Sequence, residues 1–276
     1  QRRLDAQYRL LLHLGEHPFG EAAAGHMADM ELDQLVVSAS GEPGALEGLG
    51  RFLSVMLSLN VVLQCDGDFC ERTGEACSSD QLDRCSGEDI VACVDGRGTG
   101  LKGRDFKKVT QLELGKYEVE DQIEAARKLS ALPYIDEART GIWGWSYGGF
   151  MSTNCILKGN HVFEMAISVA PVTSWRFYDT IYTERYMHTP QENPGGYDDN
   201  SPLHFADQLK GKFLLVHGSA DDNVHVQNTM RMIEALVQAN KPFDWAIYPD
   251  KNHGIYGGNT SLHLYSKMTR FVLENL

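Results

Sequence analysis

Short apolar runs alternate with longer amphipathic segments from about residue 90 to the end of the chain. The apolar runs, each of strand length, are residues 90–94, 140–145, 165–170, 213–216 and 243–248. The amphipathic segments 117–132, 226–239 and 261–273 place apolar residues near helical spacing. Alternating strands and helices favour a parallel sheet with helices on both faces. The pattern therefore predicts an α/β fold for residues 90–276.

Residues 1–89 show no such pattern and differ in composition from the rest. Residues 1–90 contain 16 acidic residues and six arginines, a net charge of −10 out of −13 for the whole chain, and lysine first occurs at Lys102. Two interpretations stay open: a disordered acidic segment, or one that is not native to the domain behind it. We therefore expect the sheet to lack complete amino-terminal strands. Because the chain begins at Gln1, we also expect a piece of a longer protein.

Charge and apolar run length exclude two kinds of partner. A strongly acidic chain lacks the basic patch that nucleic-acid binding needs, and no apolar run reaches the roughly 18 residues of a membrane span. The cysteines Cys65, Cys70, Cys77 and Cys85 do not form the pairs of a zinc site, and their spacing fixes no disulfide pattern. Cys93 and Cys155 stand in apolar surroundings and are expected to be buried thiols.

A sharp turn is predicted at residues 144–149, GWSYGG, between an apolar run and a segment that can continue as a helix. In the G-x-S-x-G pattern the serine is the nucleophile of a strand-turn-helix elbow, and small residues are needed two positions before and after it. Gly144 and Gly148 meet that need around Ser146. The motif is short and also occurs by chance, so the remaining catalytic groups must support it.

A serine hydroxyl needs a base, and the base needs an acid to fix its tautomer. In α/β hydrolases these follow in the order serine, acid, histidine. Asp221 and Asp222 lie in the loop 219–223 after the strand 213–217, and we prefer Asp221 because Asp222 could instead cap the next helix. Of ten histidines, only His253 combines a loop after a strand, a following glycine and the right order, while His217 fits a core residue equally well. This chemistry needs no cofactor or metal.

Several longer motifs carry a family resemblance. They are GWSYGG at 144–149, VAPVTSW at 169–175, YD at 178–179, YTERYM at 182–187, DGRG at 95–98, EVEDQIEAAR at 118–127 and HGSADDNVH at 217–225. Over about residues 90–276 the chain resembles the prolyl oligopeptidase family of serine peptidases, and within it the dipeptidyl peptidase IV branch. The resemblance implies an α/β-hydrolase fold with 90–276 as the catalytic domain.

The resemblance also implies roles for individual residues. Ser146 would be the nucleophile, Asp221 the acid, His253 the base and the backbone N–H of Tyr147 an oxyanion donor. Walls of a proline-sized pocket would come from Tyr147, Val172, Trp175, Tyr178 and Tyr182. Asn223, and also Arg97, would contact substrate carbonyls or hold the site together.

The implied substrate is a peptide with proline or alanine at its second position. The implied partner is a second copy of the chain, and the implied location is the periplasm, the cell surface or the medium. The chain departs from the family because no propeller repeat is present and no Tyr-x-Gly-Pro-like segment supplies a second oxyanion donor. The only tyrosine before Tyr117 is Tyr8, and losing one such donor costs about a hundredfold in rate. Two alternatives stay open: an acylaminoacyl peptidase or esterase, and an inactive fragment.

Overall fold

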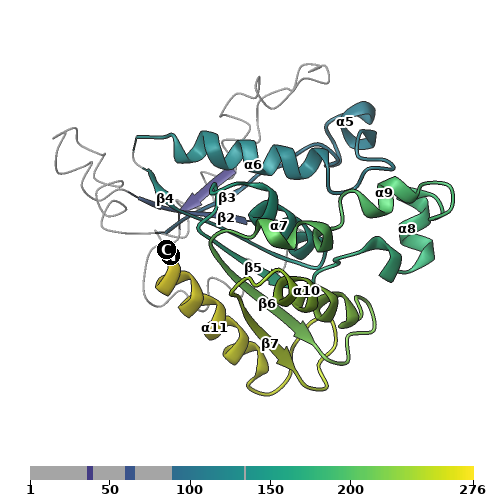
Figure 1. Ribbon diagram of the computed structural model, residues 1–276. Helices are drawn as coiled ribbons and strands as arrows, with labels where there is room; N and C mark the ends of the chain where they lie inside the picture. Colours follow the sequence, from purple (N-terminus) through teal and green to yellow (C-terminus); the bar gives the residue numbers. More distant parts are fainter. Residues whose placement is uncertain (1–35, 40–59, 66–88, 134) are drawn as a thin grey trace.

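The fold is built on one seven-stranded sheet. A computed structural model of the chain describes residues 36–39, 60–65, 89–133 and 135–276 (Figure 1). The strands are β1 (Val36–Ala39), β2 (Asn60–Cys65), β3 (Asp89–Cys93), β4 (Ile135–Trp145), β5 (Met165–Val169), β6 (Lys212–Gly218) and β7 (Asp244–Tyr248). Their order across the sheet is β1-β3-β2-β4-β5-β6-β7.

Strand direction divides the sheet into two parts. From β4 through β7 every neighbouring pair is parallel. Strand β2 is antiparallel to both β3 and β4, and β1 is antiparallel to β3. Strands β1 and β2 come from the amino-terminal part of the chain, where the sequence shows no strand pattern. They run against the direction of the other five strands.

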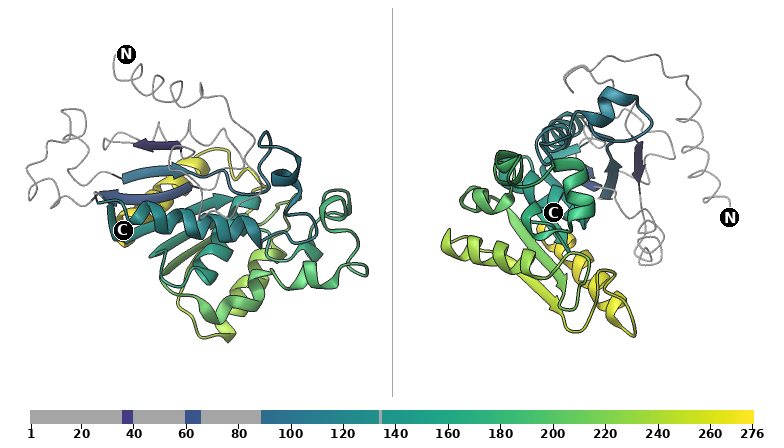
Figure 2. Two further views of the ribbon diagram at one scale, coloured as in Figure 1. Left: turned by 90° about the horizontal axis from the view of Figure 1, so that it is seen from above. Right: turned by 90° about the vertical axis from the view of Figure 1, so that its right-hand side faces the viewer.

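Helices cover both faces of the sheet. They are α5 (Arg104–Lys108), α6 (Tyr117–Ser130), α7 (Tyr147–Lys158), α8 (Thr180–Met187), α9 (Pro194–Asp198), α10 (Gln227–Gln238) and α11 (Thr260–Asn275). Buried residues of α6, α7 and α10 share one apolar cluster, and those of α11 share another. Figures 1 and 2 show α11 on the far side of the strands from α6 and α7.

The two clusters follow from the alternation of side chains along a strand. In β6, Phe213 and Leu215 pack in the cluster beneath α6, α7 and α10. Leu214 and Val216 pack on the other side, with α11. Strands buried on both faces must be apolar throughout, which is the pattern read in the sequence. The predicted α/β-hydrolase fold, a mostly parallel sheet with helices on both faces, is confirmed.

A long insertion between β5 and β6 carries helices that periodicity did not predict. It holds α8, α9 and the 3-10 helices Trp175–Phe177 and Pro202–Gln208. Local capping starts α8 and α9, because the Asp179 side chain accepts from Tyr182 N–H, and Asn193 accepts from Gly196 N–H behind Pro194. Helices this short have no long apolar stripe to detect. Within the described residues, no helix is long and apolar enough to cross a membrane.

Candidate active site

Ser146 stands on a strained turn between β4 and α7. Its backbone adopts φ 61° and ψ −115°, a conformation that persists only where surrounding structure enforces it. Its N–H donates to the Val169 carbonyl at 2.8 Å, which ties the turn to β5. A Cβ on Gly144 would lie 2.3 Å from the Gly148 carbonyl carbon and oxygen. The turn is therefore as tight as the predicted elbow requires.

Helix α7 begins at Tyr147, directly after the serine. The first N–H groups of a helix have no acceptor within the helix and form a site for negative charge. The backbone N–H of Tyr147 belongs to this group and adjoins Ser146. This position suits the oxyanion donor that the resemblance implies.

Asp221 and His253 meet at the carboxyl ends of β6 and β7. The Asp221 Oδ2 atom lies 2.7 Å from His253 Nδ1. The Asp221 side chain is fully buried and the His253 side chain is 21% exposed. Trp145 Nε1–H donates to the His253 carbonyl at 3.0 Å, which fixes the histidine loop to the residue before Ser146. A carboxylate on Nδ1 fixes the imidazole tautomer and leaves Nε2 to act as a base.

Other hydrogen bonds hold the Asp221 carboxylate in its ionised form. Its Oδ1 accepts from the backbone N–H groups of Asn223 at 3.0 Å and Val224 at 2.9 Å. Burial alone would raise the pKa of Asp221. The hydrogen bonds from His217 and His253, with the charge of His253 and the Asn223 N–H, outweigh burial and hold the pKa below its usual range.

His217 is both a core residue and a neighbour of the acid. It is fully buried, and its Nε2 lies 2.7 Å from the Val224 carbonyl oxygen and 3.2 Å from Asp221 Oδ2. Because a carbonyl oxygen only accepts, Nε2 carries the proton and points at both oxygens. The Nδ1 atom lies 2.7 Å from Thr229 Oγ1. His217 therefore closes the loop that presents Asp221.

The alternative acid, Asp222, is exposed, and no side chain forms an N-terminal cap on helix α10.

The predicted pocket residues form one aromatic cluster around Trp175. Its ring centroid lies 5.7 Å from that of Tyr147, 5.9 Å from Tyr182 and 6.0 Å from Tyr178. Val172 belongs to the same buried cluster as Trp175, and each is 2% exposed. Tyr178 and Tyr182 meet edge to face at 5.3 Å. Aromatic faces suit contact with an apolar ring and offer little to a charged group.

Asn223 and Arg97 make different contacts. Tyr178 Oη donates to Asn223 Oδ1 at 2.7 Å, so Asn223 links the aromatic cluster to the loop of Asp221. Arg97 donates to both Asp121 carboxylate oxygens, by Nη2 at 2.7 Å and by Nε at 2.9 and 3.0 Å. Arg97 therefore holds the loop after β3 against α6. Of its two expected roles, these contacts fit that of holding the site together.

Glu118 is a buried neighbour of the site that sequence reasoning missed. Its Oε1 accepts from Tyr147 Oη at 2.5 Å and from the Gly115 N–H at 2.7 Å. A signal was present in the sequence, because Glu118 precedes Gln122, Ala125 and Leu129 by four, seven and eleven positions, and all four are buried in α6. That spacing marks one helix face.

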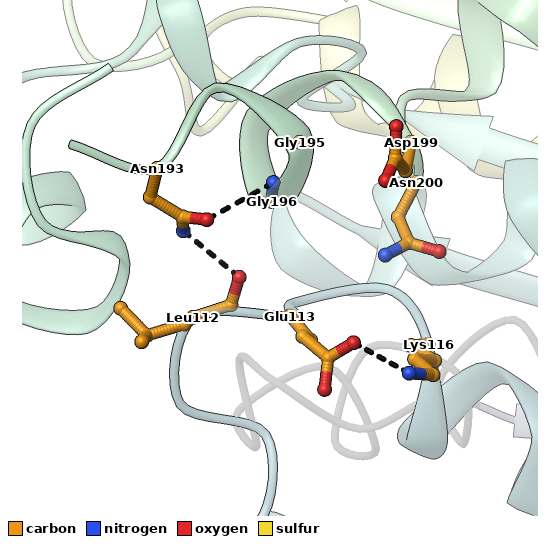
Figure 3. A pocket seen from close by; sticks show the side chains of 8 residues that line it. All are labelled: Leu112, Glu113, Lys116, Asn193, Gly195, Gly196, Asp199 and Asn200. Carbon is orange, nitrogen blue, oxygen red and sulfur yellow. Dashed lines mark hydrogen bonds and ion pairs between the residues drawn. The ribbon is translucent and has the colours of Figure 1, made fainter. Parts of the chain in front are cut away.

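A polar pocket of about 530 Å³ lies beside this region, between residues 112–116 and α9 (Figure 3). None of the predicted site residues lines it. Asn193 bridges its two sides, donating to the Leu112 carbonyl at 3.0 Å and accepting from Gly196 N–H at 3.1 Å. Glu113 and Lys116 form an ion pair at its edge.

Two of the cysteines have described side chains. Cys155 is fully buried as predicted, and Cys93 is half-buried. The side chains of Cys65, Cys70, Cys77 and Cys85 lie outside the described residues.

Comparison with known proteins gives consistent matches over the carboxyl-terminal two thirds of the chain. The model of the prolyl oligopeptidase family matches residues 85–276. "Probable dipeptidyl-aminopeptidase B" of Ajellomyces capsulatus strain H88 is 47% identical over 188 residues, covering 67% of this chain and 20% of that protein. The protein of the same name from Paracoccidioides lutzii is 49% identical over 189 residues, covering 67% and 21%.

A solved structure matches the same region. The crystal structure of Porphyromonas gingivalis dipeptidyl peptidase 4 is 56% identical in sequence, with a TM-score of 0.68. The match covers 71% of this chain and 28% of that one. This chain spans about a fifth of the length of the curated relatives that it matches.

Proposed function

The chain belongs to the prolyl oligopeptidase family, and we propose that it is a serine peptidase that releases dipeptides by cleaving after proline or alanine at the second position. The observation that carries the proposal is the pairing of Asp221 with His253 at 2.7 Å, on a loop that Trp145 holds beside the Ser146 elbow. A buried acid, an oriented base and a strained serine are the parts that acyl transfer requires.

The proposed reaction proceeds through an acyl-enzyme. Ser146 Oγ attacks the carbonyl carbon of the second substrate residue while His253 Nε2 takes the hydroxyl proton. The carbonyl oxygen becomes an anion and accepts a hydrogen bond from the Tyr147 N–H. His253 then donates its proton to the leaving amine as the C–N bond breaks. Water attacks the ester in the same way, releasing the dipeptide and restoring the Ser146 hydroxyl.

Electrostatics around Asp221 suit this sequence of proton transfers. Its lowered pKa keeps the carboxylate ionised wherever the imidazolium has to form. The carboxylate stays beside Nδ1 and stabilises the positive charge without taking the proton. His217 and the backbone N–H groups of Asn223 and Val224 hold it in place.

The aromatic cluster supports the substrate preference. Tyr147, Tyr178 and Tyr182 pack around Trp175, and the proposed binding surface for the second substrate residue is made of their ring faces and edges. A pyrrolidine ring gains more contact with such walls than a methyl group does, so proline should bind better than alanine, and charged side chains should be rejected. Asn223, oriented by Tyr178, is proposed to donate its amide N–H to a substrate carbonyl.

Hydrolysis of Gly-Pro and Gly-Ala p-nitroanilides by the protein and by its Ser146→Ala variant tests the proposal. We expect release of nitroaniline that the substitution abolishes. Turnover of N-acylated amino-acid anilides or p-nitrophenyl esters without Gly-Pro cleavage would favour the acylaminoacyl peptidase or esterase alternative. No turnover of any substrate would favour the inactive fragment. A second copy of the chain as partner, and a location in the periplasm, at the surface or in the medium, remain predictions from the family.

A further inference from the structure

Glu118 is a buried carboxylate that touches the active site without taking part in the proposed chemistry. It lies in the first turn of α6 and is 6% exposed. Its Oε1 accepts two hydrogen bonds, from Tyr147 Oη at 2.5 Å and from Gly115 N–H at 2.7 Å. Within the described part of the chain, its Oε2 has no hydrogen-bond partner. Burying a carboxyl group with one oxygen unpaired costs folding free energy, so the position of Glu118 beside Tyr147 needs an explanation.

Both donors approach Glu118 Oε1 closely. Hydrogen bonds of the O–H···O⁻ type fall near 2.5–2.7 Å and are roughly twice as strong as neutral ones. Burial raises the pKa of Glu118, and the donors Tyr147 and Gly115 oppose that rise. Burial and the neighbouring carboxylate also raise the pKa of Tyr147, so its hydroxyl keeps its proton and donates. The ionisable groups that interact with Glu118 are Asp121, Tyr147, Cys155, Lys158 and Tyr182.

Glu118 is itself held rigidly. Gly115 has φ +91°, and a Cβ there would lie 2.5 Å from the Phe150 ring carbon Cζ, so glycine is required for its N–H to point at Glu118. Asn193 fixes the start of the same segment through the Leu112 carbonyl (Figure 3). Lys158 Nζ lies 3.4 Å from the Gly115 carbonyl. The carboxylate is therefore a fixed point.

We propose that Glu118 is a positioning residue that locks the Tyr147 ring as a wall of the substrate pocket and thereby sets the preference for proline over alanine. The inference rests on the proposed function. Tyr147 contacts Phe150 and Trp175 by ring packing, at 5.6 and 5.7 Å. The hydrogen bond from Tyr147 Oη to Glu118 anchors the far end of the ring and resists swinging of the whole side chain about χ1. If Tyr147 is held less firmly, binding of a proline ring, which fills the pocket, weakens more than binding of an alanine side chain, which contacts the pocket only through a methyl group.

A double-mutant cycle tests the inference. Tyr147→Phe removes the donor and keeps the ring, Glu118→Leu removes the acceptor, and Glu118→Gln keeps an acceptor of the same shape. The measured quantity is the ratio of kcat/KM for Gly-Pro and Gly-Ala p-nitroanilides, per active site labelled by a fluorophosphonate. A general loss of folded protein lowers both substrates equally and leaves this ratio unchanged.

We expect Tyr147→Phe and Glu118→Leu each to lower the proline-to-alanine ratio about tenfold, the lower end of what one methylene of pocket contact contributes to discrimination. The double variant should match the single ones, because both substitutions break one contact, and Glu118→Gln should retain most of the ratio. Glu124→Gln is the matched control: it lies on the same helix, is partly exposed and forms an ion pair with Arg127 at 3.6 Å.

Three outcomes would count against these statements. An unchanged ratio in Tyr147→Phe, which conserves the ring and so is the variant least prone to misfold, would overturn the inference alone. Effects that multiply in the double variant would also overturn it, since the two residues would then act separately. Failure of the unchanged protein to cleave either anilide would overturn the proposed function and the inference with it.

Discussion

Replacing Gly144 with alanine probes the elbow more directly than any change to Ser146. An added Cβ would lie 2.3 Å from the Gly148 carbonyl carbon and oxygen and 2.7 Å from its Cα. Ordinary contacts to a Cβ begin near 3.4 Å, so the backbone on one side must move by about 1 Å. Both contacting groups are backbone, so no side chain can rotate away to relieve the overlap.

The displacement has two measurable consequences. Overpacking of this severity costs about 3 kcal/mol of unfolding free energy, which lowers Tm by roughly 6–12 °C for a domain of this size. A shift of about 1 Å in a reacting group can also cost about a hundredfold in rate. Helix α7 begins beside Ser146, so the serine and the Tyr147 N–H would move together. Differential scanning calorimetry and the rate of fluorophosphonate labelling measure the two effects.

Gly100→Ala supplies the matched control. Gly100 has an ordinary φ, and an added Cβ there would meet nothing within 4 Å. That substitution should leave labelling unchanged and alter stability by no more than about 1 kcal/mol. A Gly144→Ala protein that labels at the unchanged rate and melts with the Gly100→Ala protein would refute the claim that a close turn presents Ser146.

Four further expectations follow from the site. Asp221→Asn should lower kcat for Gly-Pro anilide by about 10⁴-fold through the wrong imidazole tautomer, and an unchanged kcat would remove Asp221 from the mechanism. The folded-state pKa of Asp221 is depressed below 3.8. Ionisation of Asp221 therefore stabilises the fold above pH 3.8, and this contribution is lost as the pH falls through the folded-state pKa. In thermal melts, the unchanged protein should lose more stability between pH 6 and pH 2 than Asp221→Asn does. Trp175 is 2% exposed, so Trp175→Ala should cost about 3–5 kcal/mol of stability in urea unfolding. It should also lower the preference for proline over alanine, and an unchanged preference would mean that other residues line the pocket. Tyr178→Phe should lower kcat/KM about fivefold by freeing Asn223, with no change expected in Tm beyond a few degrees.

The sequence predicts best where one local pattern determines the structure. The apolar strands, helix α6 ahead of Pro133 and the elbow around Ser146 each depend on periodicity or on a steric rule that neighbouring residues obey. The order of residues along the chain pointed to Asp221 as the acid and His253 as the base, and in the structure Asp221 Oδ2 lies 2.7 Å from His253 Nδ1. The grouping of the aromatic residues came from family resemblance, because nothing local distinguishes pocket walls from core.

The features that sequence reasoning missed depend on distant contacts. Glu118 reads as one more charge in the first turn of a helix, and only the approach of Tyr147, 29 positions away, makes it part of the site. The contact of His217 with Asp221 likewise could not be predicted from local sequence, because it depends on how the loop after β6 folds back. The strands β1 and β2 lie in the amino-terminal part of the chain, where no alternation of strands and helices is visible, and the helices α8 and α9 are too short for periodicity to be detected.

The central claim is that Ser146 is a nucleophile activated by His253 and Asp221. Peptide mapping of the protein after reaction with a fluorophosphonate tests it most directly, alongside the His253→Gln variant. We predict one adduct, located on Ser146, that forms readily in the unchanged protein and is nearly lost in His253→Gln while the fold is kept. An adduct on another residue, or labelling of Ser146 at the same rate without His253, would contradict the account.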